Sequence, residues 1–198
     1  MNGLQKMANG YYDDDSKCII GEKLIFRPIT PADTDRVISW RNSSHVRENF
    51  IYQQPFTREG HERWLETQVA TGQAIQFIMC EKEGDDGKYL PGRPVGSCYL
   101  RDIDHEFRKA EYGMFIGVED VKGMGYGSEA ATYTIEYAFR VLKLHKVFSR
   151  IFATNIPSIK GCERAGMVRE AYLKDEVRLH NKYVDIVLLA RINEESTI

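Results

Sequence analysis

Three glycines at alternate positions, Gly123, Gly125 and Gly127, most constrain what this chain can fold into. They lie between an apolar run, MFIGV, and the run SEAATYTIEYAFRVLK, whose apolar residues recur at helical spacing. Glycine at this density permits a tight turn, or a close approach of the backbone to a ligand. The pattern therefore predicts a strand, a glycine loop and a helix, whose backbone N–H groups would together form an anion site.

Other kinds of glycine loop fit this stretch less well. A Walker A loop ends in Gly-Lys-Ser or Gly-Lys-Thr, but here Lys122 precedes the glycines. Gly125, Gly127 and Ala130 match the G-x-G-x-x-A fingerprint of dinucleotide-binding folds. That fingerprint requires an acidic residue about 20 residues further on, and residues 143–160 contain no Asp or Glu. The glycines therefore favour a phosphate-binding loop that is neither a Walker A loop nor a dinucleotide-binding loop. The alternative is that they only form a tight turn between the strand and the helix.

The composition narrows the class of protein. The 198 residues suffice for one domain with a sizeable core. The net charge of -2 gives no basic field that would indicate nucleic acid. The cysteines form no CxxC pair, the histidines show no metal-ligand spacing, and no apolar run approaches the about 20 residues of a membrane helix. We therefore expect a cytoplasmic protein without metal, nucleic-acid or membrane partners. The oligomeric state is left open, with a homodimer as one option.

The apolar pattern and the capping signals predict one domain. We expect a polar lead-in over residues 1–20 and a single domain over residues 21–198. Within that domain the predicted order of elements is β-α-α-β-β-β-α-β-α-β-β. Thr30, in a capping box with Asp33, and Thr57 are the expected N-caps of the first two helices. Gly166 is placed to end the last helix.

Three motifs resemble those of the GCN5-related N-acetyltransferases, the GNAT family. KGMGYG (residues 122–127) is similar to the R/Q-x-x-G-x-G/A loop of that family, with Lys122 in place of Arg or Gln. RKAEYG (residues 108–113) is similar to R-x-A-E-x-G, and NIPSIKGCERAGM (residues 155–167) to N-x-x-S-I-x-x-x-E-K-x-G-F. The resemblance covers about residues 23–191. It implies the sandwich-like α+β fold of the family, with a mixed, mostly antiparallel central sheet of six or seven strands and about four flanking helices.

The resemblance also implies acetyl-CoA as the cofactor. Its pyrophosphate would bind residues 122–128, and its pantetheine would lie along residues 114–118. Two neighbouring strands, ending near Val118 and Thr154, would splay apart to admit it. Lys160 would reach the adenosine phosphate, or would simply be exposed. The expected cofactor-binding residues are Phe115, Ile116, Val118, Lys122, Gly123, Met124, Gly125, Tyr126, Gly127, Ser128, Asn155, Ser158 and Lys160.

Acetyl transfer to an amine requires a proton acceptor for the amine and a proton donor for the departing thiolate. Glu111 is the expected base, because a carboxylate on a mostly apolar strand would be desolvated. The alternative is an ion pair with Arg108 or with a cation of another strand. Cys162 stands where many family members carry a tyrosine, and a thiol pKa of about 8.5 would suit a donor. Otherwise Cys162 is a packing residue, and water or a tyrosine (Tyr126, Tyr172 or Tyr183) donates.

The acceptor is expected beneath the first two helices and the loop between them. Trp40, Arg41 and Arg47 belong to a pattern similar to that of acetyltransferases acting on nucleotide-linked amino sugars. The two arginines would bind a diphosphate, and Trp40 would stack on the acceptor or pack into the core. The chain also resembles spermidine and ribosomal-protein N-terminal acetyltransferases, and RDIDHE (residues 101–106) supplies carboxylates for a polyamine.

We therefore expect an acetyl-CoA-dependent N-acetyltransferase acting on a small-molecule primary amine, such as that of a nucleotide-linked amino sugar. A polyamine or a protein N-terminus is the alternative acceptor. A non-catalytic CoA-binding protein of the same fold is the remaining alternative. The complete glycine loop and Glu111 favour the enzyme.

Overall fold

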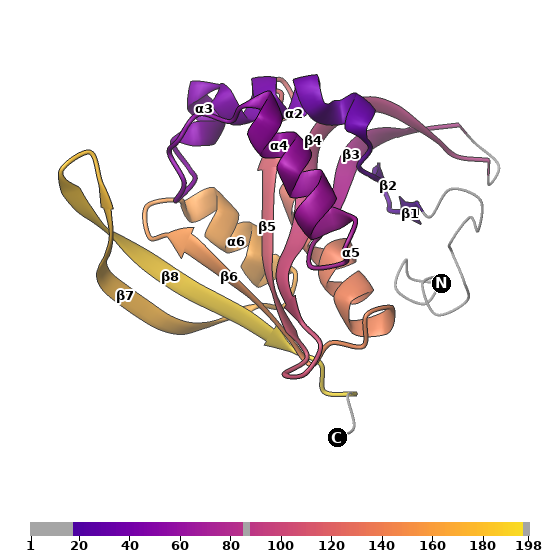
Figure 1. Cartoon of the computed structure of the whole chain (residues 1–198). Coiled ribbons are helices and arrows are strands. Elements are labelled where there is room, and N and C mark those ends of the chain that lie inside the picture. Colours follow the sequence, from indigo (N-terminus) through magenta and orange to yellow (C-terminus); the bar gives the residue numbers. More distant parts are fainter. Residues whose placement is uncertain (1–17, 85–87, 196–198) are drawn as a thin grey trace.

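The computed structural model describes residues 18–84 and 88–195, and within them eight strands form one sheet (Figure 1). The strands are β1 (Ile19–Ile20), β2 (Leu24–Pro28), β3 (Ile75–Glu83), β4 (Leu90–Asp104), β5 (Lys109–Ile116), β6 (Lys146–Phe152), β7 (Val168–Leu179) and β8 (Lys182–Ile192). Their order is β1-β2-β3-β4-β5-β6-β8-β7, and only β5 and β6 pair in parallel. The predicted α+β class with a mostly antiparallel sheet is confirmed.

The prediction of six or seven strands was slightly low. The additional strand is β1, whose two residues lie in the predicted lead-in and pair with Phe26 and Ile25 of β2. Two residues are too few for a period of two to be recognised in the sequence. The rest of the predicted lead-in, residues 1–17, lies outside the described residues.

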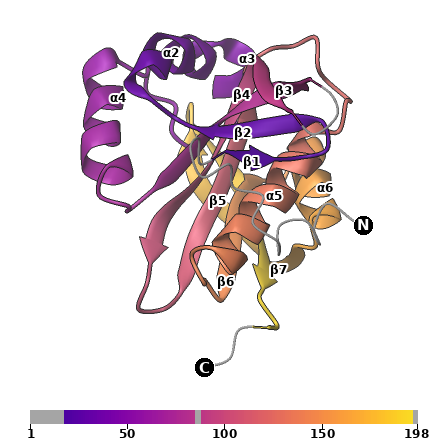
Figure 2. The same ribbon diagram turned by 90° about the vertical axis from the view of Figure 1, so that its right-hand side faces the viewer.

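Helices cover both faces of the sheet (Figures 1 and 2). They are α2 (Thr34–Asn42), α3 (Ser44–Arg47), α4 (Arg58–Trp64), α5 (Tyr126–Arg140) and α6 (Ile156–Arg164), with a 3₁₀ turn, η1 (Pro31–Asp33), and a π-helical turn, η2 (Leu65–Val69). One core cluster lies between the sheet and α5 and α6, and includes Ile135 and Leu189. A second, smaller cluster lies beneath α2 and includes Trp40 and Phe115. Side chains of β5 therefore reach both layers.

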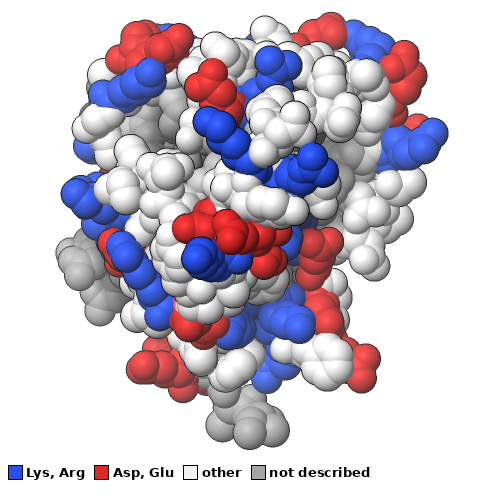
Figure 3. All heavy atoms as spheres, turned by 90° about the vertical axis from the view of Figure 1, so that its left-hand side faces the viewer, with Lys and Arg blue, Asp and Glu red and all other residues white. Residues whose placement is uncertain are grey.

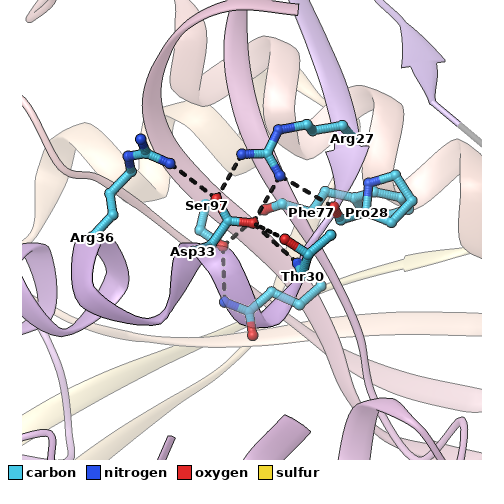
Figure 4. A network of polar contacts seen from close by, with 8 residues as sticks. Arg27, Pro28, Thr30, Asp33, Arg36, Phe77 and Ser97 are labelled. Atoms are coloured by element: carbon cyan, nitrogen blue, oxygen red, sulfur yellow. Dashed lines mark hydrogen bonds and ion pairs between the residues drawn. The ribbon is translucent and has the colours of Figure 1, made fainter. Parts of the chain in front are cut away.

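Asp33 fixes the start of α2 (Figure 4). Its buried carboxylate accepts hydrogen bonds from the Arg27 guanidinium at 2.6 and 2.8 Å, from Arg36 at 3.0 Å and from the backbone N–H of Thr30 at 3.0 Å. Burial acts to raise the pKa of Asp33, but the bonds from Arg27 and Thr30 outweigh it, so the pKa is lowered. The predicted capping box at Thr30 is confirmed. This network joins α2 to β2.

The remaining helix signals were also correct. Thr57 caps α4, because its hydroxyl accepts a hydrogen bond of 3.1 Å from the N–H of Gly60. Gly166, with a φ of +85°, follows the end of α6. A dinucleotide-binding fold needs a mostly parallel sheet, so the antiparallel sheet excludes that alternative for the glycine loop. No helix in the described part of the chain is long and apolar enough to span a membrane.

Candidate active site

The parallel strands β5 and β6 separate in the middle of the sheet. Their backbones pair only where residues 109–111 lie opposite residues 146–148, although β5 continues to Ile116 and β6 to Phe152. On its other side β5 keeps its pairs with β4 as far as Ile116. The edge of β5 that faces β6 is therefore open from Tyr112 onward, as the sequence resemblance predicted. A cavity of about 910 Å³ lies at this opening, lined by residues of β5, β6, the glycine loop and α6.

The glycine loop forms one wall of this cavity. Gly123 and Gly125 have φ angles of +83° and +85°, a left-handed conformation that side chains rarely adopt. Gly125 is the N-cap of α5, so the loop leads directly into the N-terminus of a 15-residue helix. The first N–H groups of a helix have no intrahelical acceptor, and the helix dipole favours an anion beside them. The arrangement suits a pyrophosphate.

Most of the residues expected to bind the cofactor line this cavity. They are Phe115, Ile116, Lys122, Gly123, Gly125, Tyr126, Gly127, Ser128, Asn155, Ser158 and Lys160. Val118 and Met124 are not among the described residues that line it; Val118 packs against the larger core cluster. Met124 faces solvent, and its carbonyl accepts a hydrogen bond of 2.9 Å from the Lys23 ammonium. The Asn155 side chain caps α6 by accepting a bond of 3.3 Å from the N–H of Ser158.

Glu111 lies at the apex of the cleft, in the last residue pair between β5 and β6. Its carboxylate is part of a residue only 4% exposed, and it accepts hydrogen bonds from two arginines. Arg101 of β4 donates at 2.8 and 3.0 Å, and Arg150 of β6 donates at 3.0 and 3.1 Å. The carboxylate is buried, as expected, but it is also paired with cations, and its role as the base stays a prediction. The alternative of an ion pair with cations of other strands is what the structure has, and Arg108 instead donates to the carbonyl of Lys143.

Cys162 of α6 lines the cavity but is poorly suited to donate a proton. Burial raises the pKa of its thiol to about 12, with a smaller contribution from the charge of Glu163. The expected match with the pKa of a departing thiol is therefore wrong, because Cys162 is the weaker acid. Among the tyrosines considered as donors, Tyr126 lines the cavity and its hydroxyl donates to Glu81 at 3.1 Å. Tyr172 and Tyr183 are exposed elsewhere, on the β7–β8 hairpin.

Replacing Cys162 with alanine should leave turnover within about threefold of the native value. The raised pKa keeps the Cys162 thiol neutral between pH 6 and 9. Its ionisation therefore does not affect the dependence of kcat on pH in that range. Losing a general acid typically lowers turnover about 10²–10⁴-fold. Measuring kcat from pH 6 to 9 on Cys162→Ala tests this, and a hundredfold loss in a folded variant would restore Cys162 as the donor.

Trp40, Arg41 and Arg47, which we expected to bind the acceptor, lie outside the described cavity lining. Trp40 packs into the smaller core cluster, where a Cβ on Gly117 would come within 2.2 Å of its ring. Arg41 is only 6% exposed, and its guanidinium lies 3.3 Å from the centroid of the Phe50 ring. Burial lowers the pKa of Arg41 to about 10. Trp40 and Arg41 belong to the packing beneath α2, which for Trp40 is the alternative stated from the sequence, and Arg47 lies in α3.

Replacing Arg41 with methionine should raise the melting temperature by about 2–16 °C. No carboxylate in the described part of the chain pairs with Arg41, and one of its nitrogens, Nη1, is buried without a hydrogen-bond partner. Exchanging a buried charge for an apolar side chain of similar volume often stabilises by about 1–4 kcal/mol, and each kcal/mol moves the melting temperature by about 2–4 °C. Thermal unfolding of Arg41→Met, with the exposed Arg63→Met as control, measures this. A clear drop for Arg41→Met alone would show that the guanidinium–aromatic contact is stabilising.

Several residues in the cavity were not among the site residues expected from the sequence. Arg101, Arg150 and Tyr99 lie around the apex, Tyr52 and His45 come from the segment near α3, and Tyr112 and Arg164 lie on the side of α5 and α6. Arg101 is directly opposite Glu111 in the register of β4 and β5. Opposite charges on facing positions of adjacent strands attract, so the pair could have been found had that register been known.

Comparison with known proteins identifies the class to which this fold and cleft belong. The sequence profile described as acetyltransferase (GNAT) domain matches residues 23–168. The chain belongs to the GNAT family. It is 35% identical over 177 residues to an uncharacterised N-acetyltransferase, YnaD, of Bacillus subtilis, covering 89% of this chain and 98% of that protein.

Two further matches, one in sequence and one in structure, are to spermidine acetyltransferases of Vibrio cholerae. The spermidine N(1)-acetyltransferase of Vibrio cholerae is 27% identical over 92 residues, which cover 46% of this chain and 53% of that protein. The crystal structure of the spermidine N-acetyltransferase from Vibrio cholerae in complex with CoA and spermine superposes with a TM-score of 0.76 at 18% identity. That match covers 88% of this chain and 98% of the other, and at this identity it establishes the fold.

The protein is therefore an enzyme that transfers an acetyl group from acetyl-CoA to an amine. Acetyl-CoA supplies the acetyl group as a thioester. The residues present fit this cofactor: the glycine loop and the N-terminus of α5 suit its pyrophosphate, and the open edge of β5 suits its pantetheine. Lys160 and Arg164 of α6 also line the cavity, and their cations suit a further phosphate.

Proposed function

We propose that this enzyme acetylates the primary amine of an acceptor that also carries negative charge, with a nucleotide-linked amino sugar as the favoured class. The observation that carries the proposal is the charge at the apex of the cleft. Arg101 and Arg150 both line the cavity there. Glu111 is the one carboxylate among the described lining residues, and it already pairs with both of them.

Arg150 is the side chain best placed to meet such an acceptor. Its side chain is 38% exposed, against 19% for Arg101, so it retains N–H groups that are open to a ligand. A guanidinium can donate two parallel hydrogen bonds to the oxygens of one phosphate or carboxylate, which fixes the orientation of the ligand as well as adding affinity. Tyr52, whose ring lies 5.6 Å from the Arg101 guanidinium, adds an exposed aromatic surface against which a sugar or base could pack. These two arginines take the role first expected of Arg41 and Arg47.

A polyamine is the second candidate, because a spermidine acetyltransferase of Vibrio cholerae is similar in sequence and a structure of that name shares the fold. A polycation would require carboxylates at the acceptor end of the cavity. Asp102, Asp104 and Glu106, which could have supplied them, are not among the described lining residues. On the face shown in Figure 3, acidic and basic side chains are interspersed, without a broad field of one sign. The charges nearest the apex therefore favour an anionic acceptor.

A thiol-release assay with acetyl-CoA tests this choice. The acceptors are an amino sugar linked to a nucleoside diphosphate, the same sugar without the nucleotide, spermidine, and a peptide with a free N-terminus. We expect the nucleotide-linked sugar to be used best, and its KM to rise about tenfold in Arg150→Gln, since a hydrogen bond to a charged group contributes about 1.5–3 kcal/mol. A preference for spermidine or for the peptide, or an unchanged KM in a folded Arg150→Gln variant, would contradict the proposal.

A further inference from the structure

Tyr112 carries a buried hydroxyl group with no hydrogen-bond partner within the described residues. The residue is 2% exposed, and it lines the cavity. It is the first residue of β5 beyond the last pair with β6, so its backbone lies where the cleft opens. Its ring belongs to the larger core cluster, between the sheet and α5 and α6.

Within the described residues, no group accepts a hydrogen bond from the Tyr112 hydroxyl. Burial raises the pKa of Tyr112, and the charges of Cys98, Cys162 and Tyr99 act in the same direction. The Cys98 sulfur already accepts a hydrogen bond of 3.2 Å from Thr134. Cys162 is a small side chain of α6 that also lines the cavity, so no bulky group on α6 closes the space at that position. A buried hydroxyl without a partner destabilises the fold, and its retention beside a ligand cavity is explained if the ligand supplies the acceptor.

We propose that the Tyr112 hydroxyl donates a hydrogen bond to the sulfur of CoA. The glycine loop suits the pyrophosphate at one end of the cavity, and the open edge of β5 runs from there back toward Tyr112 at the apex. A pantetheine that follows this edge brings its terminal sulfur to the end at which Tyr112 lies. Tyr112 is thereby a catalytic residue, because it touches the atom that leaves.

The hydrogen bond from Tyr112 acts on the sulfur of the thioester C–S bond, which breaks during acetyl transfer. As the amine nitrogen forms its bond to the carbonyl carbon, the electron pair of the C–S bond passes to sulfur, and Tyr112 stabilises that charge while keeping its own proton. Burial raises the pKa of Tyr112 well above 10, whereas a thiol ordinarily has a pKa of about 8.5. A full proton transfer from the phenol would therefore be unfavourable. The surplus proton of the amine leaves to water, and the thiolate takes one from water, so protons balance.

The test is the ionisation of CoA bound to the protein, followed through the ultraviolet absorbance of the thiolate. In the native protein we expect the pKa of the bound CoA thiol to lie about one unit below that of free CoA, since a hydrogen bond to a charged group changes affinity about tenfold. In Tyr112→Phe this shift should be lost, and turnover should fall about tenfold. Calorimetry at a pH where the thiolate predominates should show about tenfold weaker CoA binding, with unchanged affinity for desulfo-CoA.

Stability separates this role from a structural one. Tyr112→Phe removes an unpaired hydroxyl, so its melting temperature should be equal to or higher than that of the native protein. Tyr133→Phe is the matched control, because Tyr133 is a buried tyrosine of α5 outside the described cavity lining. Equal ionisation of CoA on the native protein and on Tyr112→Phe would overturn the proposal. A native protein that leaves the pKa of the CoA thiol unshifted would overturn it even if the variant did not fold. Neither readout involves an acceptor, so the result is independent of the proposed acceptor class.

Discussion

Gly125→Val is expected to abolish CoA binding while the protein still folds. Gly125 has a φ of +85° and is the N-cap of α5, so a β-branched side chain there would be strained and would crowd the phosphate. Losing two hydrogen bonds to a charged ligand, at about 1.5–3 kcal/mol each, weakens binding on the order of a hundredfold or more. Isothermal titration calorimetry with CoA measures the loss.

The matched control for this variant is Gly72→Val. Gly72 has a φ of +76°, no atom within 4 Å of an added Cβ, and a position outside the described cavity lining. Both substitutions introduce backbone strain of about 1–3 kcal/mol, but only the one in the loop should affect CoA. Native CoA affinity in a folded Gly125→Val variant would show that this loop is not the phosphate site.

Glu111→Gln is expected to lower the melting temperature by about 6–12 °C and turnover by less than tenfold. The amide cannot satisfy two guanidinium groups, and breaking a buried ion pair costs about 3–5 kcal/mol. The low end of this range, about 3 kcal/mol, applies because Arg150 is partly exposed and can be hydrated. At about 2–4 °C per kcal/mol, this loss of stability lowers the melting temperature by about 6–12 °C. Thermal unfolding and kcat, with kcat measured well below the melting temperature, give both numbers.

Glu136→Gln is the control that isolates the chemistry at Glu111. Glu136 is also 4% exposed and pairs with two arginines, Arg140 and Arg191, each at 2.8 Å, but it lies outside the described lining of the cleft. The two variants should lose similar stability. A loss of turnover of about 10²–10⁴-fold confined to Glu111→Gln would instead identify Glu111 as the general base first expected from the sequence.

Local signals in the sequence predicted most of the residues that line the cavity near the glycine loop. The glycine loop, the motif that begins at Asn155 and the strand before the loop are contiguous motifs, and each depends on residues within a few positions of one another. The element order followed from apolar periodicity and caps for the same reason. Two short elements were missed. The strand β1 is defined by its pairing partner and not by its own pattern, and the four residues of α3 are too few to show a helical period.

The acceptor half could not be predicted in the same way, because it depends on contacts between distant residues. The partners of Glu111 come from β4 and β6, ten residues before it and 39 residues after it. Arg41 resembled a ligand-binding residue in the sequence, yet Phe50 and Phe56 enclose it in the fold. Tyr112 was visible only as a neighbour of Glu111, and its unpaired hydroxyl becomes evident once the packing of the helix layer is known.

The central claim is that CoA binds in the cleft between β5 and β6, and a thermal unfolding series with CoA tests it most directly. A ligand that binds only the folded state at 100 times its dissociation constant stabilises by about 2.7 kcal/mol, which corresponds to a rise in melting temperature of about 5–11 °C. We predict that rise with CoA and acetyl-CoA for the native protein, its loss in Gly125→Val, and no rise with a nicotinamide dinucleotide. An unchanged melting temperature at saturating CoA, or a rise with the dinucleotide instead, would contradict the account.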